Sequence, residues 1–276
     1  MTKQELFSQI TAQFFSVYSL KENRVVLQKD GEYECYPASV TKVLNALLAF
    51  KYLKLDEKIV VGPEQDVMHL SPDPSVAGLV KGEVWTFGDI LYASLLPSGN
   101  DAAYTIGYSV AKKVAKEELS TKKLCHLYAK MMNDYAKELG CKRTHFSTLD
   151  GNDYVNGRIV RHVTSTNDLC MIFKEALKYP DLIKVMATEK KDIKIGDKEY
   201  NFVNTNRLIR KDNEFYNPYV IGGKTGTTSL AGCCLGIIVK KEDEEYIIAI
   251  CFSATGKDRF NDANMIIDYI LNNNEE

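Results

Sequence analysis

The chain has 276 residues, of which 45% are hydrophobic and 26% charged, a composition typical of a globular protein with a sizeable core. Its net charge of -2 predicts neither a nucleic-acid-binding surface nor an acidic disordered tail. The apolar runs are too short to span a bilayer, and the N-terminal residues are polar, so we expect no membrane anchor and no signal peptide in this chain. Either the protein acts in the cytoplasm or a leader has been removed.

Both ends of the chain predict strands flanked by a helix. Residues 2–13 have the apolar spacing of a short helix, and residues 14–20 and 24–28 favour two strands joined by a tight turn. Towards the other end, three segments favour consecutive strands and the last segment favours a helix. These segments are 219–227, 233–240, 246–253 and 258–271.

The middle of the chain is mainly helical in pattern. A buried helix is expected from near Ser39 to Leu53, and residues 56–81 look like a loop because prolines and glycines are frequent there. Further helices are predicted from Thr86 to Pro97, from Asp101 onwards, over 124–139 and over 166–177, with Pro180 stopping the last of them.

These elements predict an α/β (α+β) fold, with an antiparallel sheet of about five strands covered by the N- and C-terminal helices and an inserted all-helical lobe. Residues 1–60 and 215–276 would form the sheet lobe, and residues 61–214 the mainly helical lobe. Together they would make one catalytic unit with a cleft between the lobes. The seven cysteines lack Cys-x-x-Cys spacing, so we expect mostly buried thiols, no metal site and no cofactor.

Ser39 and Lys42 are the first candidate catalytic pair. If a helix begins near Ser39, its hydroxyl and the Lys42 amine lie one turn apart on the same face. A neutral amine in hydrogen-bond reach can take the proton of a serine and make it a nucleophile. The Ser-x-x-Lys pattern also occurs at Ser109 and Ser120, where it suits an ordinary solvated helix, so this pair needs support from other motifs.

Two further motifs supply that support. Ser98 and Asn100 flank a glycine at a corner between two predicted helices, and Lys224-Thr225-Gly226 lies on a predicted strand. In this order the three motifs are the set found in penicillin-binding proteins and serine β-lactamases. Residues 91–103, 162–169, 204–208 and 221–228 narrow the likeness, and the sequence from Phe14 to Leu271 resembles the low-molecular-mass D-alanyl-D-alanine carboxypeptidases.

The resemblance implies an activity and roles for the motif residues. The substrate would be a peptidoglycan stem peptide ending in D-Ala-D-Ala, with Ser39 as nucleophile, Lys42 as general base and Ser98 as proton relay. Asn100 would bind the substrate or Lys42. Lys224 and Thr225, followed by Gly226 and Thr227, would bind the substrate, with Lys224 and Thr225 holding its terminal carboxylate.

By the same resemblance, the backbone N–H groups of Ser39 and Thr227 would form the oxyanion hole. β-Lactams would acylate Ser39, and the protein would act outside the cytoplasm, in the cell envelope or secreted. The family's leader, C-terminal β-rich domain and amphipathic membrane anchor have no counterpart in these residues.

Two other functions fit the same motifs. One is a serine β-lactamase of the same fold, although no glutamate between the second and third motifs has an asparagine four residues on, as the Glu-x-x-Leu-Asn signature of the best-known class requires. The other is a non-catalytic protein that binds cell-wall peptides or β-lactams. A Ser-His-Asp hydrolase is disfavoured because the Gly-x-Ser-x-Gly elbow is missing.

Overall fold

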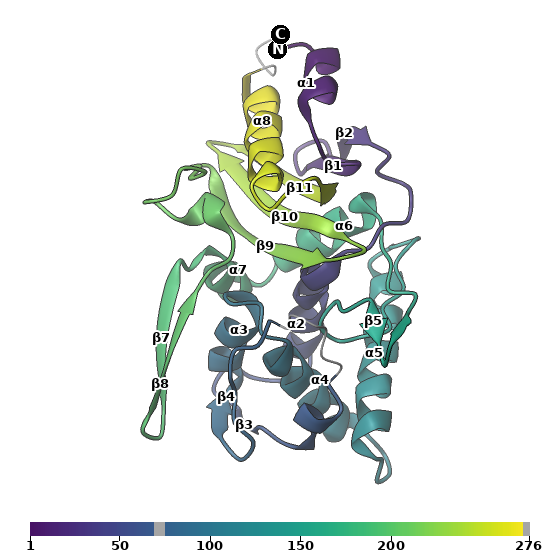
Figure 1. Ribbon diagram of the computed structural model, residues 1–276, viewed down its shortest axis with the longest axis vertical. Helices are drawn as coiled ribbons and strands as arrows, with labels where there is room; N and C mark the ends of the chain where they lie inside the picture. Colours follow the sequence, from purple (N-terminus) through teal and green to yellow (C-terminus); the bar gives the residue numbers. More distant parts are fainter. Residues whose placement is uncertain (69–74, 273–276) are drawn as a thin grey trace.

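The computed structural model describes residues 1–68 and 75–272, and its centre is a five-stranded antiparallel sheet (Figure 1). The strand order is β2-β1-β11-β10-β9, so strands from the two ends of the chain lie side by side and β9 forms one edge. The strands are β1 (Phe14–Ser19), β2 (Arg24–Lys29), β9 (Val220–Thr228), β10 (Gly232–Lys241) and β11 (Glu244–Ser253). The predicted sheet and its N-terminal hairpin are confirmed.

Helices cover both faces of the sheet. Helices α1 (Lys3–Gln9) and α8 (Asp258–Asn272) lie on one face, and α6 (Thr166–Ala176) packs on the other (Figure 1). Alternate residues of the central strands therefore enter different cores: Ile248 joins the core beneath α8, and its neighbour Ile247 joins the core on the α6 side. This two-sided burial explains why the last strands read as almost continuous apolar runs.

The rest of the chain is mainly helical and lies below the sheet in Figure 1. Its helices are α2 (Lys42–Phe50), α3 (Phe87–Leu95), α4 (Asn100–Val114), α5 (Thr121–Glu138) and α7 (Pro180–Ala187). Helix α2 is the centre of this part, because every residue from Lys42 to Ala49 is buried. A helix enclosed on all sides holds its first residue, Lys42, in a fixed place.

Three short two-stranded pieces modify the expectation of an all-helical lobe. They are β3 (Lys58–Val60) with β4 (Val84–Thr86), β5 (Tyr154–Val155) with β6 (Arg158–Ile159), and β7 (Lys190–Ile195) with β8 (Lys198–Val203). Two 3-10 turns, Pro63–Asp66 and Arg207–Ile209, add to them. The stretch expected to be a loop thus contains β3 and one 3-10 turn, and its residues 69–74 lie outside the described part of the chain.

Two helix starts differ from the prediction. Ser39 lies in a 3-10 turn, Ala38–Thr41, and the α-helix begins only at Lys42; Ala38 has a left-handed φ of 48°, which an α-helix does not allow. Pro180 begins α7 instead of only ending α6, because proline at a helix's first position loses no hydrogen bond. The lobe boundaries near residues 60 and 215 stay predictions. Of the helices described, none combines the length and apolar character needed to cross a membrane.

Candidate active site

Ser39 and Lys42 are in direct contact at the start of α2. The Lys42 Nζ atom lies 2.7 Å from Ser39 Oγ, 2.8 Å from Asn100 Oδ1 and 2.8 Å from the carbonyl oxygen of Asp150. These partners come from the 3-10 turn, from α4 and from the loop of residues 147–152. Three separate segments therefore hold the amine beside the serine hydroxyl.

Burial changes the protonation of Lys42. The side chain has no exposed surface, and removal from water lowers its pKa from 10.5 to about 8. The carboxylates of Asp150 and Asp101 act in the opposite direction, because negative charges stabilise the protonated amine. A substantial fraction of Lys42 is therefore neutral near pH 8, as a general base requires.

Lys224 is the second buried amine of the site. It lies on β9, its Nζ donates to the carbonyl oxygen of Thr225 at 2.8 Å, and its side chain is almost wholly enclosed. Burial, followed by the positive charges of Lys42 and Arg259, lowers the pKa of Lys224 well below its ordinary value. From the sequence we expect burial and the charge of Lys224 both to lower the pKa of Lys42. Burial does lower it, and the mutual repulsion of the two amines contributes to the lowered pKa of Lys224.

Two glycines allow the backbone to close tightly around Ser39. A Cβ atom on Gly226 of β9 would lie 2.8 Å from both the Pro37 carbonyl oxygen and the Ser39 nitrogen. A Cβ atom on Gly151, which has a φ of 98°, would lie 2.0 Å from the Ala38 carbonyl oxygen. Only glycine fits at these positions, so β9 on one side and the 147–152 loop on the other approach the backbone of the turn that carries Ser39.

Ser98 and Asn100 form the third corner of the site. Ser98 has a left-handed φ of 67°, and Asn100 begins α4 with its backbone N–H donating to the Ser75 carbonyl oxygen at 2.8 Å. Both side chains are buried and line the same cavity as Ser39. A strained residue that the surrounding structure holds in place is common at catalytic sites.

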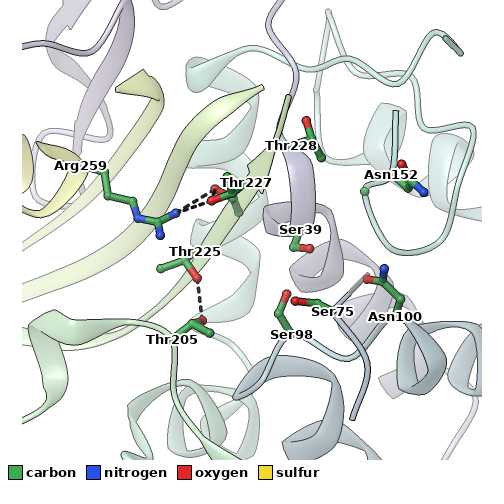
Figure 2. A pocket seen from close by; sticks show the side chains of 12 residues that line it. Ser39, Ser75, Ser98, Asn100, Asn152, Thr205, Thr225, Thr227, Thr228 and Arg259 are labelled. Carbon is green, nitrogen blue, oxygen red and sulfur yellow. Dashed lines mark hydrogen bonds between the residues drawn. The ribbon is translucent and has the colours of Figure 1, made fainter. Parts of the chain in front are cut away.

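The predicted residues meet at one cavity of about 150 Å³, with Ser39 between β9 and the helical side (Figure 2). Ser39, Ser98, Asn100, Thr225, Gly226 and Thr227 line it directly. Lys42 and Lys224 do not line the cavity themselves. They contact residues that do: Lys42 contacts Ser39 and Asn100, and Lys224 contacts Thr225. The cavity also contains residues that we did not single out from the sequence: Ser75, Gly151, Asn152, Thr205, Thr228 and Arg259.

Two of these additional residues support β9. Arg259, at the start of α8, donates from Nη1 to the Gly226 carbonyl oxygen at 2.9 Å and to Thr227 Oγ1 at 3.0 Å (Figure 2). The hydroxyls of Thr205 and Thr225 share a hydrogen bond of 2.6 Å. Thr205 falls within the segment 204–208 that carries part of the family resemblance, whereas Arg259 belongs to no short motif.

Comparison with known protein families gives a match over most of the chain. The family model described as D-alanyl-D-alanine carboxypeptidase matches residues 1–256. The chain belongs to this family. D-alanyl-D-alanine carboxypeptidase DacF of Bacillus subtilis is 30% identical over 258 residues, which are 91% of this chain and 60% of that protein. The chain therefore spans less than two thirds of the length of this relative.

A sequence match and a structural match, both from Streptomyces strain K15, extend the comparison. A Streptomyces D-alanyl-D-alanine carboxypeptidase is 29% identical over 237 residues, which are 84% of this chain and 77% of that protein. The crystal structure of a Streptomyces DD-transpeptidase has a TM-score of 0.82 and 25% sequence identity, and it covers 94% of this chain and 97% of that one. The predicted family and its fold are confirmed.

Proposed function

We propose that this chain is a serine D-alanyl-D-alanine carboxypeptidase, which removes the terminal D-Ala from peptidoglycan stem peptides. The observation that carries the proposal is the 2.7 Å contact between Lys42 Nζ and Ser39 Oγ, in a cavity faced by the Lys224-Thr225-Gly226 strand. Family membership supports the same activity, because the named relatives are D-alanyl-D-alanine carboxypeptidases.

The surroundings of Lys42 suit a neutral base. A neutral amine has two N–H bonds and one lone pair. The oxygens of Asn100 and Asp150, each 2.8 Å away, accept the two N–H bonds, so the lone pair faces the Ser39 hydroxyl. Lys42 would then take the Ser39 proton as Oγ attacks the carbonyl carbon of the penultimate D-Ala.

The remaining steps follow from the positions of the neighbouring groups. The tetrahedral oxyanion would be bound by the backbone N–H groups of Ser39 and Thr227, which lie on segments brought together at Gly226. When the peptide C–N bond breaks, Ser98 would relay the proton to the leaving D-Ala amine. Water would then hydrolyse the ester on Ser39 and release the shortened peptide.

The carboxylate of the substrate would bind at the strand side of the cavity. Thr225 offers a hydroxyl, Arg259 lines the cavity with a positive charge, and Lys224, when protonated, adds a positive charge from its buried position on β9. An incoming carboxylate would stabilise protonated Lys224 and so oppose the depression of its pKa by burial. Asn100 would contact the substrate amide as well as Lys42.

The partners and the location follow from the substrate. Stem peptides ending in D-Ala-D-Ala are the expected partner, and they lie outside the cytoplasm, so we propose an extracytoplasmic site of action. β-Lactams mimic the dipeptide and would leave Ser39 acylated.

Mass spectrometry of the intact protein after incubation with benzylpenicillin tests this proposal. The expected result is a long-lived adduct whose mass equals that of the protein plus the drug, absent in the Ser39→Ala variant. A parallel assay would detect D-alanine released from a peptide ending in D-Ala-D-Ala. Rapid turnover of penicillin without an adduct would indicate a β-lactamase, and peptide binding without D-alanine release would indicate a non-catalytic binding protein.

A further inference from the structure

His162 is a fully buried histidine that none of the proposed steps uses. Its Nε2 lies 2.8 Å from the hydroxyl of Thr41, and its Nδ1 lies 3.1 Å from the backbone nitrogen of Ser147 and 3.3 Å from that of Thr148. The ring stacks on Phe146 with a centroid distance of 4.7 Å and an interplanar angle of 9°. Both ring nitrogens and one ring face are therefore engaged.

These contacts determine the protonation of the ring. Backbone N–H groups can only donate, so Nδ1 carries the lone pair, and the hydrogen on Nε2 is donated to Thr41 Oγ1. Burial, with smaller contributions from His145 and Lys42, lowers the pKa of His162 to about 3. The ring is thus neutral and in one tautomer wherever the enzyme is folded near neutral pH.

The two segments that His162 joins both hold Lys42. Thr41 is the residue before Lys42, at the end of the 3-10 turn. The other segment is the 147–152 loop, whose Asp150 carbonyl oxygen accepts a hydrogen bond from Lys42 Nζ and whose Leu149 carbonyl oxygen accepts one from Asn45 of α2. The histidine therefore spans the gap between the turn that carries the proposed nucleophile and the loop that orients the proposed base.

We propose that His162 is a positioning residue: it fixes the Asp150 carbonyl relative to Thr41, and so keeps the lone pair of Lys42 directed at Ser39. This inference rests on the proposed function, in which Lys42 is the base. A purely structural histidine would affect thermal stability without altering the titration of Lys42. The pH profile of acylation therefore distinguishes the two roles.

The decisive variant is His162→Phe, which keeps a ring stacked on Phe146 and loses the hydrogen bonds of both ring nitrogens, to Thr41 at Nε2 and to Ser147 and Thr148 at Nδ1. We expect its limiting rate of acylation by benzylpenicillin to fall roughly 10²-fold, the cost of misplacing a reacting group by about 1 Å. Loss of the Asp150 acceptor also removes a bond to the protonated amine, so the rising limb of the pH profile should move below pH 8. The other charged groups facing Lys42, which are Asp150 on the loop, Asp101 on α4 and Lys224 on β9, are unchanged.

Conservative and control variants complete the experiment. His162→Gln should keep most of the limiting acylation rate and the pH at which that rate rises. Its side-chain amide can accept hydrogen bonds from the loop N–H groups and donate one to Thr41. His126→Gln, an exposed histidine on α5, is the matched control and should behave as the wild type. Thermal melting of each variant reports whether it is folded.

Thr41→Val keeps the proposal testable if His162→Phe does not fold, because it removes only the hydroxyl that accepts from Nε2. We expect slower acylation, and we expect the rising limb of the pH profile to move to lower pH, as for His162→Phe. A folded His162→Phe or Thr41→Val enzyme with the wild-type rate and pH limb would overturn the positioning role while leaving the proposed function intact. A wild-type protein that penicillin does not acylate would remove the proposed function and this inference with it.

Discussion

The two walls of the cleft each bury one lysine, but the two amines have different partners. Lys42 lies in the turn wall, made of residues 38–42 and 147–152. Its Nζ atom has three oxygen atoms within 2.8 Å, from Ser39, Asn100 and Asp150. In the strand wall, made of residues 224–228 of β9, Lys224 donates to one backbone carbonyl and feels the positive charges of Lys42 and Arg259. Equal burial therefore leads to different electrostatic environments.

In the proposed mechanism, this difference assigns proton transfer to Lys42 and anion binding to Lys224. Burial lowers the pKa of Lys42, and the carboxylates of Asp150 and of Asp101 on α4 oppose this, which leaves the pKa at about 8, within reach of physiological pH. On the strand wall, positive charges lower the pKa of Lys224 further, so an approaching carboxylate would be strongly stabilising there. We infer that each lysine acquires its role from its neighbours, since the side chains themselves are the same.

Removing the amine of the turn wall should have the largest effect. Lys42→Ala deletes the proposed general base, and we expect the rate of acylation by penicillin to fall roughly 10²- to 10⁴-fold. Stopped-flow or quenched mass spectrometry would measure it. Lys51→Ala, an exposed lysine just after α2 that pairs with Glu138, is the control and should leave the rate unchanged. Near-normal acylation by the Lys42 variant would show that another group is the base.

Adding a methyl group where the two walls touch should have the next largest effect on the acylation rate. Gly226→Ala would place a methyl group 2.8 Å from the backbone at Pro37 and Ser39, so β9 and the turn must separate. We expect acylation to slow roughly 10²-fold, as for a misplaced nucleophile. Gly256→Ala, where the nearest atom to the new Cβ is 3.8 Å away, is the matched control. Equal rates in the two variants would argue against a tight contact between the walls.

The sequence predicts the sheet well because its strands are buried on both faces. The apolar runs of β10 and β11, separated by a short charged turn, leave few other arrangements. The β7–β8 hairpin was missed because its first strand, from Lys190 to Ile195, carries three lysines and one aspartate, which strands disfavour. Its second strand is stabilised by tertiary contacts, with Tyr200 and Phe202 packing on Trp85. Local sequence carries no sign of such contacts.

For the site, motif residues could be predicted and supporting groups could not. Ser39, Asn100 and Thr225 lie in short patterns with a chemical meaning, and the structure places them around one cavity. The Asp150 carbonyl acts through its backbone, which any residue type would provide, so its identity gives no signal. Arg259 reaches β9 from a helix 33 residues beyond Gly226, a contact that depends on the packing of α8 against the sheet.

Deleting a hydroxyl of the strand wall should have a smaller and more selective effect. Thr225→Ala should weaken binding of substrates that carry a terminal carboxylate roughly tenfold, about the value of one charge-assisted hydrogen bond. Esters or amides lacking that carboxylate should be affected much less. Comparing kcat/KM for the two substrate classes provides the test, and an equal loss for both would contradict the assignment of Thr225 to carboxylate binding.

The pH dependence of the wild-type protein gives the smallest expected change and tests the turn wall without a mutation. Protonated Lys42 cannot accept the Ser39 proton, so acylation should slow as pH falls below its pKa of about 8 and level off above it. Between pH 7 and pH 8 the neutral fraction, and with it the limiting rate, should rise about fivefold. Rates should be taken at saturating penicillin, so that a change in the charge of Lys224 affects binding and not the measured step. A limiting rate that is flat or falls across this interval would show that deprotonation of Lys42 does not limit acylation.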